Sequence, residues 1–441
     1  MPRGSPRVSS RRRLSLLVAL LAGALAVSLS LRHLARQPVA AAETPVAPKG
    51  WWRLALGEAE LATTDREQLA RQLSLPYAAG VVRAEGRFGV RAWDRARALD
   101  GFNLYVSGHA PEAILMAMDG GVVHRWRFPF ERAFPGRAAT NDCAFFRRAA
   151  LLDDGGLVAI YQGGGVVRLD AESRLVWRAA VAAYNDLWVA PGGERVRILV
   201  KEAVERRDLV PDGPLLEDFV VTLDGAGREL ARASLLAAFE RSAFRGLIRP
   251  LGASADIFHS NTLAVLERAA PAAPAPFAPG NLLVSLREID TLAVLDPAAR
   301  QVLWARRGPW RGQHEPSPLP DGRLLLFDNL GGGEGISRVL AVAPESGATE
   351  SLWPPAGVTF FSRQAGSVAR LANGDLLIVE SERGAAFEVD PGGRVVWEFR
   401  SPHRAGARGE LVATLFDLVR YAPTTPFLAR LALASAPPQA P

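Results

Sequence analysis

The sequence predicts an all-β fold, a six-bladed β-propeller preceded by an N-terminal signal or anchor helix and a short helical lead-in. Two observations predict the propeller: a turn followed by an apolar run recurs from about residue 100, and a tryptophan recurs behind that turn. Short alternating strands, frequent turns and a period of about forty to sixty residues are typical of this fold. A third observation, a basic and then apolar N-terminus, predicts the preceding segment.

The recurring unit has a turn glycine, an apolar run, and a polar or small residue seven positions after the glycine. Asp-Gly and Asn-Gly favour tight hairpins, because their central residues need positive φ. The units are "DGFNLYVSG" (100–108), "DGGLVAIYQ" (154–162), "PGNLLVSLR" (279–287), "DGRLLLFDN" (321–329) and "NGDLLIVES" (373–381), and they end at Gly108, Gln162, Arg287, Asn329 and Ser381.

Tryptophans mark the second half of four units. Trp126, Trp177, Trp304 and Trp397 follow their turn glycines by 22 to 25 residues. Residues 192–230 read as a diverged copy, which brings the count to six. A β-sandwich does not explain this spacing, and the tryptophans are expected to pack between blades rather than form a site.

The N-terminus reads as a targeting segment. Five arginines precede an apolar run from Leu14 to Leu31, so we expect this end to stay in the cytoplasm and the rest to be exported. "VAAAE" at 39–43 offers a cleavage site, yet the run is long enough to anchor the chain in a membrane, and both outcomes stay open. We expect a periplasmic protein, or one held in the inner membrane with the propeller outside the cytoplasm.

The predicted domain boundaries follow from these patterns. Residues 1–45 form the signal peptide or membrane anchor, 46–99 a helical lead-in, 100–402 the β-propeller, and 403–441 a C-terminal extension that is partly disordered. Within the propeller, the Pro/Ala-rich stretch at 267–280 is expected to be an exposed loop.

Composition excludes several classes of function. The net charge of +6 is spread evenly, and no basic run after residue 13 is dense enough to follow a phosphate backbone, so nucleic acid is not an expected partner. Cys143 is the only cysteine, so no internal disulfide forms. No acidic cluster suits the calcium of a quinone-dependent dehydrogenase, and neither a metal nor a cofactor is expected.

Polar residues from different units are expected to meet at one mouth of the central channel. His314 and Asn185 each lie eight residues before a turn glycine, and His259 and Asn261 lie in the corresponding strand of their blade. Arg287 ends the strand that follows them. Alternate residues of a strand share a face, so we expect His259 and Asn261 to point at a common anion. A single histidine most often has a structural role, and the convergence of several residues is what favours a site.

These residues resemble the bacterial arylsulfate sulfotransferases, six-bladed propeller enzymes that move a sulfuryl group between phenols without a nucleotide sulfate donor. The resemblance runs from about residue 102 to about residue 400, and its most specific segments are "DIFHSNTL", "GNLLVSLREIDTLAVLD" and "GQHEPSPLPDGRLLLFDN". It implies an aryl sulfate as donor and a phenol as acceptor.

The resemblance also implies roles for these residues. His314 matches the family's nucleophile, which carries the sulfuryl group as a sulfohistidine. His259, Asn261 and Arg287 match the residues that bind the sulfate oxygens, a task that suits cationic and amide donors. Asn185 stands where the family commonly has a histidine; its amide can donate a hydrogen bond to sulfate, but it cannot act as an acid.

A second reading is a non-catalytic propeller that binds an anionic ligand or a partner protein at its channel mouth. The sequence does not decide the physiological donor and acceptor, the activity of the Asn185 variant, or the oligomeric state. Asp328 and Asn329 are expected to satisfy a strand end rather than orient the pocket.

Overall fold

A computed structural model describes residues 79–84, 86–137, 143–211, 214–248, 255–268 and 273–435. The chain divides into two compact units, Met1–Trp52 and Arg53–Pro441, and every described residue belongs to the second. The predicted signal or anchor at 1–45, most of the helical lead-in and the tail from Pro437 lie outside the described residues. No helix in the described part is both long and apolar enough to cross a membrane.

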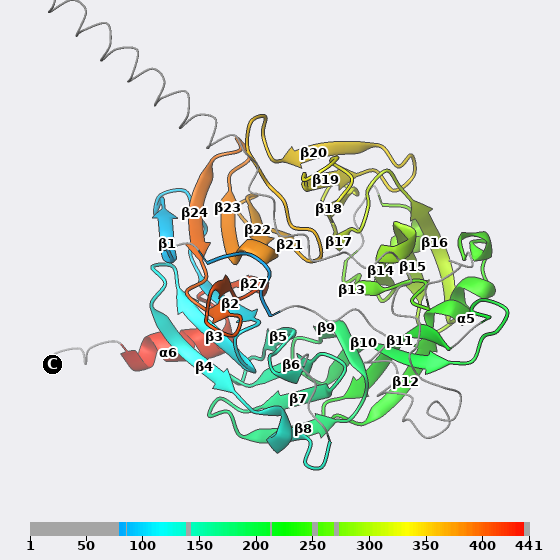
Figure 1. Cartoon of the computed structure of the whole chain (residues 1–441), viewed down its shortest axis with the longest axis horizontal. Helices are drawn as coiled ribbons and strands as arrows, with labels where there is room; N and C mark the ends of the chain where they lie inside the picture. The colour runs from blue at the N-terminus through cyan, green and yellow to red at the C-terminus, as the bar shows by residue number, and fades with distance from the viewer. Residues whose placement is uncertain are drawn as a thin grey trace, which may run out of the picture. The chain divides into compact units, whose positions relative to one another are not determined.

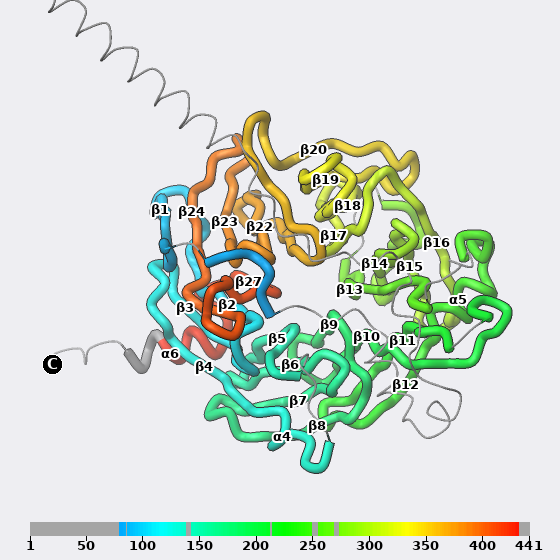
Figure 2. The backbone as a smooth tube through the Cα atoms, in the orientation of Figure 1, coloured from blue at the N-terminus to red at the C-terminus, as the bar shows by residue number. Residues whose placement is uncertain are grey.

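Six antiparallel sheets form a ring, which confirms the predicted six-bladed propeller (Figure 1). We number the blades along the chain; the smoothed backbone in Figure 2 follows the same ring from blue to red. From the channel outward, blade 1 contains β27 (Leu415–Tyr421), β2 (Phe102–Ser107), β3 (Glu112–Ala117) and β4 (Val122–Arg127), and blade 2 contains β5 (Arg148–Leu151), β6 (Leu157–Tyr161), β7 (Gly165–Leu169) and β8 (Leu175–Ala179). In the same direction, blade 3 contains β9 (Ala183–Val189), β10 (Arg195–Val204), β11 (Leu215–Asp224) and β12 (Glu229–Ser234), and blade 4 contains β13 (Ser260–Val265), β14 (Leu282–Leu286), β15 (Thr291–Asp296) and β16 (Gln301–Arg307). Blade 5 contains β17 (His314–Pro318), β18 (Leu324–Asp328), β19 (Arg338–Val342) and β20 (Thr349–Trp353), and blade 6 contains β21 (Ser367–Arg370), β22 (Leu376–Glu380), β23 (Ala385–Val389), β24 (Val395–Arg400) and β1 (Gly89–Trp93).

Both ends of the described chain take part in the ring. β27 pairs with β2 from Phe102↔Tyr421 to Ser107↔Leu415, so the C-terminal segment supplies the inner strand of blade 1. β1 pairs with β24 and adds a fifth, outer strand to blade 6. The sheets therefore extend from residue 89 to residue 421, beyond the predicted limits of 100 and 402, because strand pairing between distant segments leaves no local sequence signal.

The turn glycines occupy equivalent hairpins, as the repeat predicts. Gly155, Gly322 and Gly374 have φ of 91°, 85° and 94°, a region that favours glycine. Each donates its backbone N–H to the carbonyl of the leucine three residues earlier. The residue seven positions after each glycine consequently lies just beyond the second strand of its blade, at the opposite end of the propeller.

Tryptophans of the outer strands join neighbouring blades. Trp126 and Trp397 are fully buried, and their indole N–H groups donate to Gly155 O (3.0 Å) and Met118 O (2.8 Å) in the next blade. These contacts bear out the expected packing role.

Short elements connect the strands. The helices are α4 (Phe130–Ala133), α5 (Leu235–Glu240), α6 (Pro426–Ser435), η2 (Arg245–Leu247), η3 (Ala275–Phe277), η4 (Arg287–Ile289) and η5 (Ser381–Arg383). A two-stranded hairpin of β25 (Arg404–Ala405) and β26 (Leu411–Val412) precedes β27. In the predicted exposed loop at 267–280, Phe277 is buried and its ring packs against that of Trp304 at 5.1 Å.

Candidate active site

The predicted site residues come together at one end of the channel, where the second strands of the blades end and the inner strands begin. Arg287 directly follows β14, and His314 opens β17. His259 precedes β13, and its backbone carbonyl accepts a hydrogen bond from Arg287 N at 3.3 Å. Asn261 Nδ2 donates to Gln313 O at 2.8 Å, which joins the inner strands of blades 4 and 5.

Irregular backbone at the starts of the inner strands aims these side chains. Asn185 and His259 have positive φ, 58° and 46°. The β9–β10, β13–β14 and β17–β18 pairings each shift register near residues 185, 261 and 315, as at a β-bulge. His259 and Asn261 therefore do not reach the site by the simple strand alternation that the sequence suggested.

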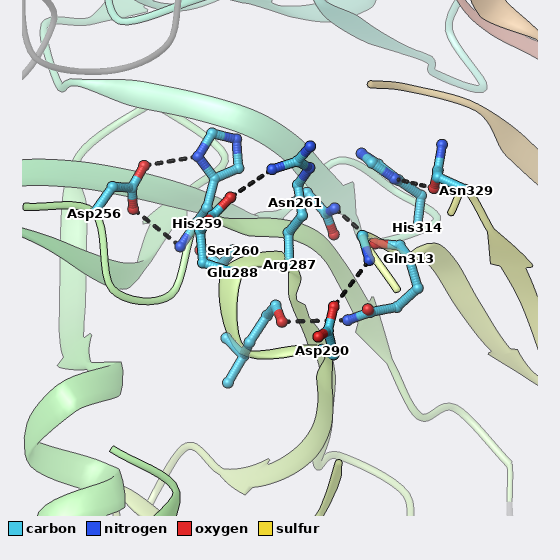
Figure 3. Close-up of polar contacts among 12 residues, drawn as sticks. Asp256, His259, Ser260, Asn261, Arg287, Glu288, Asp290, Gln313, His314 and Asn329 are labelled. Atoms are coloured by element: carbon cyan, nitrogen blue, oxygen red, sulfur yellow. Dashed lines mark hydrogen bonds and ion pairs between the residues drawn. The ribbon is translucent and has the colours of Figure 1, made fainter. Parts of the chain in front are cut away.

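His314 is the most distinctive side chain of the site. Its Nδ1 lies 2.7 Å from Asn329 Oδ1 (Figure 3). Asn329 Nδ2 donates to the carbonyls of Ser362 (2.8 Å) and Ala365 (3.0 Å), so its Oδ1 must be the atom that faces the histidine. An amide oxygen can only accept, and Nδ1 of His314 must therefore carry the proton. Nε2 is left with a free lone pair.

The electrostatics of His314 keep that lone pair available. Burial lowers the pKa of His314 to about 3, and the positive charges of Arg287 and Arg147 act in the same direction. Nε2 is buried and has no hydrogen-bond partner in the described part of the chain. A neutral, desolvated imidazole with an unpaired nitrogen is suited to nucleophilic attack.

His259 is held from both sides of its ring. Nδ1 lies 2.7 Å from Asp256 Oδ2, and Nε2 lies 3.2 Å from the hydroxyl of Tyr184. Burial and the nearby charge of Lys201 lower the pKa of His259, although Asp256 opposes them. A carboxylate on one ring nitrogen and a hydroxyl on the other form a path along which a proton can move.

A buried ion cluster supports Asp256. The ammonium group of Lys201 lies 2.5 Å from Asp256 Oδ2 and 3.9 Å from Asp218 Oδ1. Burial alone would raise the pKa of Asp256, but Lys201 and His259 hold it low. Burial raises the pKa of Asp218 to about 7. Lys201 is 2 % exposed and lies over the ring of Tyr184, at 4.1 Å from its centroid.

Arg287 supplies a positive charge between the two histidines. Its guanidinium group points between the rings of His259 and His314 in Figure 3, and its charge acts on both of them. Nη1 donates to Glu288 Oε1 at 2.5 Å, which fixes the group in place. A planar guanidinium has five donors, so this one bond leaves others for an oxyanion.

The two asparagines are tied to neighbouring backbone. Asn185 Nδ2 donates to Ser260 O at 2.8 Å, and its Oδ1 is buried without a hydrogen-bond partner among the described residues. Each of the two amide groups has a second N–H beyond the one that binds backbone. Asn185 lies beside His259 and Asn261 and holds the start of β13.

A compact ion cluster lies next along the same inner strands. Arg148 binds Asp186 (2.7 Å), Asp417 (2.8 Å) and Glu315. Thr262 Oγ1 accepts from Glu315 N, and Ser367 Oγ lies 3.3 Å from Asp417 Oδ1. All six inner strands thus contribute to this cluster, which we call the axial plug: Arg148, Asp186, Thr262, Glu315, Ser367 and Asp417.

The axial plug borders a cavity of about 500 Å³ that the remainder of the inner strands line. The cavity includes Leu187, Leu263 and Leu418, which follow the plug residues toward the turn-glycine end. His314 and Arg287 do not line it. In the described part of the chain, no group of histidine, cysteine, aspartate and glutamate side chains could hold a metal ion.

Sequence reasoning missed several supporting residues. Asp256 lies three residues before His259 in the quoted segment "DIFHSNTL", and Lys201 is the only lysine of the propeller. The sequence could therefore have singled out both residues as parts of the site. The sequence predicts a strand-end role for Asn329; its amide does bind loop carbonyls, and it also orients His314. Gln313 precedes His314 in the quoted segment "GQHEPSPLPDGRLLLFDN", whereas Tyr184 carries no sequence signal that distinguishes it from a core residue.

Comparison with known proteins gives one family. A family model described as arylsulfotransferase (ASST) matches residues 148–402, more than half of the chain. No match to a curated protein was found.

Solved structures similar to the chain are distant. They include a protein of unknown function from Bacteroides caccae (16% identity, 68% of this chain and 94% of that chain, TM-score 0.41). Two others are similarly distant. One is a streptogramin B lyase (9% identity, 79% of this chain and 96% of that chain, TM-score 0.42), and the other is TolB from Acinetobacter baumannii (12% identity, 74% of this chain and 68% of that chain, TM-score 0.42).

Proposed function

Because the chain belongs to the arylsulfotransferase family, we propose that it transfers a sulfuryl group from an aryl sulfate to a phenol, with His314 as the covalent carrier. The observation that carries the proposal is Nε2 of His314, which is buried and has no hydrogen-bond partner among the described residues, while Asn329 keeps the proton on Nδ1.

In the first step, the lone pair of Nε2 attacks sulfur and forms an N–S bond. The bond between sulfur and the aryl oxygen breaks, and the phenolate leaves with its electron pair. The ring of His314 gains positive charge, which the hydrogen bond from Nδ1 to Asn329 Oδ1 stabilises. Arg287 lies where it can offset charge on the sulfuryl oxygens through the displacement.

In the second step, a phenol attacks the same sulfur in line and the N–S bond breaks. The phenol loses its proton and His314 regains its lone pair. We assign to His259 the role of taking this proton and giving one to the leaving phenolate; because Asp256 occupies its Nδ1 and Tyr184 its Nε2, the proton would pass through the Tyr184 hydroxyl. This arrangement offers a substitute for the acid that Asn185 cannot be.

The test uses the full-length protein with 4-nitrophenyl sulfate as donor and phenol as acceptor. We expect nitrophenolate release and an acid-labile sulfuryl adduct on the peptide that contains His314, and we expect His314→Ala to lose both. His124→Gln is the matched control, because Gln can still donate to Ala171 O as His124 does on outer strand β4. Turnover by His314→Ala at the control rate would refute the proposal.

The second candidate is a propeller that binds an anion without transfer, favoured by Asn185 in place of a family histidine. It predicts that the protein binds aryl sulfates and gives neither nitrophenolate nor an adduct. Mass analysis after incubation with several donors decides between the two candidates.

We also propose that the propeller is exported and lies in the periplasm or is held at the outer face of the inner membrane. The support is the basic and apolar sequence before residue 45. Protease treatment of spheroplasts tests this: an exported propeller is cut, whereas a cytoplasmic one is protected until lysis.

A further inference from the structure

A cluster of arginines surrounds a small pocket away from His314. The pocket has eight lining residues and a volume of about 20 Å³. Five of the eight are arginines, namely Arg83, Arg87, Arg383, Arg400 and Arg404. We call it the arginine pocket.

Separate segments of the chain bring these arginines together. Arg83 and Arg87 precede β1, Arg383 closes η5, and Arg400 and Arg404 lie at the end of β24 and in β25. The backbone bridge between Arg83 and Leu411 holds the N-terminal segment against the β25–β26 hairpin. The fold itself therefore creates the charge cluster.

The pocket contains more positive than negative charge. No acidic residue lines it among the described residues. Arg400 Nε donates to Glu398 Oε1 at 2.8 Å, and Arg383 Nε lies 3.4 Å from Glu380 Oε1. Arg83 and Arg87 form no ion pair in the part of the chain that the structure describes, since none of the salt bridges there includes them.

Other exposed arginines of the propeller are arranged differently. Arg323 pairs with Asp321 and Glu350, and Arg174 pairs with Asp170 and Glu172. The arginine pocket brings five guanidinium groups together beside fewer carboxylates, Glu380, Glu398 and Glu410, and like charges held this close repel one another. An anion bound among them would offset that repulsion.

The geometry of the pocket suits a compact oxyanion. A pocket of this volume admits one or two oxygen atoms of a sulfate or phosphate group, while the rest of the anion stays outside it, and it excludes an aromatic ring. Ser401, which also lines the pocket, adds a hydroxyl. Guanidinium groups bind sulfate and phosphate oxygens through paired hydrogen bonds.

The pocket lies at the same end of the propeller as His314. η5 joins β22 to β23 as η4, which begins with Arg287, joins β14 to β15. Arg287 is also among the charges that act on Glu382, the neighbour of Arg383. The arginine pocket therefore lies at the same end of the propeller as the candidate active site.

We propose that the arginine pocket is a second oxyanion site, which binds the sulfate or phosphate group of a small ligand or of a lipid headgroup. This proposal does not depend on sulfuryl transfer at His314, because it concerns binding by residues outside the candidate active site.

The experiment compares two double variants of the full-length protein that remove the same charge. Arg83→Gln with Arg383→Gln alters two exposed arginines of the pocket, and Arg174→Gln with Arg323→Gln alters two arginines that form ion pairs elsewhere on the propeller. Circular dichroism checks that both are folded. Titration calorimetry with sodium sulfate and with sodium phosphate, at constant ionic strength set with chloride, measures binding. An additional Arg287→Gln substitution in each protein removes binding at the candidate active site from the signal.

We expect the pocket variant to bind these anions at least tenfold more weakly than the wild type, because charge-assisted hydrogen bonds are lost. The control variant should match the wild type. Equal affinities in the two double variants would overturn the proposal for free anions.

Sedimentation with vesicles identifies the source of the ligand. Vesicles of phosphatidylglycerol with phosphatidylcholine are compared with vesicles of phosphatidylcholine alone, so that insertion of the N-terminus contributes equally to both. A loss of the phosphatidylglycerol-dependent binding in the pocket variant, without calorimetric binding of inorganic phosphate, assigns the site to a lipid headgroup. If neither free anions nor these vesicles distinguish the two variants, the proposal is wrong.

Discussion

The candidate active site and the axial plug are built from neighbouring residues of the same inner strands, yet only the site keeps buried polar side-chain atoms without a partner among the described residues. His314 precedes Glu315, and Asn185 precedes Asp186, so that one residue of each pair belongs to the site and the next to the plug. In the plug, Arg148 engages three carboxylates. In the site, Nε2 of His314 has no partner within the described chain. Satisfied polar groups stabilise the ring, and the unsatisfied nitrogen is the one available for chemistry.

The largest expected effect concerns stability through the plug. Arg148→Met leaves three carboxylates in a buried cluster without their cation, and we expect a loss of about 3–5 kcal/mol in the free energy of unfolding. Urea denaturation measures it. Arg323→Met, at an exposed arginine with two carboxylate partners, is the control and should cost about 0–1 kcal/mol. Similar losses in both variants would show that the axial plug contributes no more to stability than the ion pairs of Arg323.

The second effect concerns activity through the orientation of His314. Asn329→Leu removes the acceptor of Nδ1–H, and we expect nitrophenolate release to fall about 100-fold as the reactive nitrogen loses its position and tautomer. Asn329→Asp keeps an acceptor but loses the amide that binds Ser362 O and Ala365 O. It should therefore retain more activity than Asn329→Leu at a similar loss of stability. Equal activities would make Asn329 a structural residue only.

The third effect is a pH dependence of stability that arises in the plug. Burial, with the charges of Asp186 and Asp417, raises the pKa of Glu315 to about 7, against the effect of Arg148. The folded protein therefore holds this proton more tightly than the unfolded chain. The stabilisation is present below the ordinary glutamate pKa and is lost as pH rises through about 7.

In the Glu315→Gln variant, the decrease in the free energy of unfolding between pH 5 and pH 8 should accordingly be smaller than in the wild type by about 1 kcal/mol or more. Asp218, whose pKa is also raised to about 7, keeps part of the slope in that variant. Denaturation curves at several pH values test this, and an unchanged slope would argue against protonation of Glu315.

The smallest effect concerns the connection between the two regions. Thr262 Oγ1 accepts from Glu315 N of the plug at 3.0 Å and donates to Asn261 Oδ1 of the site at 3.3 Å. Thr262→Val should cost about 1 kcal/mol of stability and lower activity less than tenfold. Thr262→Ser keeps the hydroxyl and should restore both values. If Thr262→Val lowers activity more than tenfold while the free energy of unfolding falls by only about 1 kcal/mol, the plug and the site act as one unit.

The local repeat predicted much of this arrangement. A hairpin glycine and a strand of fixed length determine which end of the sheet a residue reaches, so Gln162, Arg287, Asn329 and Ser381 lie at one end as expected. The inner-strand residues His259, Asn261, His314 and Asn185 were found by the same alignment. Six blades follow from counting the units.

The remaining features depend on contacts between distant segments. Arg148 shows no local sign that it meets Asp417, since only ring closure brings β5 and β27 together. Positive φ at His259 and the bulge at Asn261 replace the regular alternation that the sequence suggests. The strands β1 and β27 pair across most of the chain and lack the turn glycine of the repeat, so the predicted propeller was too short at both ends.

The position of β27 has a consequence for synthesis on the ribosome. Blade 1 begins near residue 102, but its inner strand, β27, is translated after the strands of all five other blades. Until then β2 presents an unpaired edge, which is prone to association with other nascent chains. Asp417 arrives with the same strand, so Arg148 receives its third carboxylate at the moment when the ring closes. Arrival of β27, rather than completion of any earlier blade, is thus the step that closes the ring.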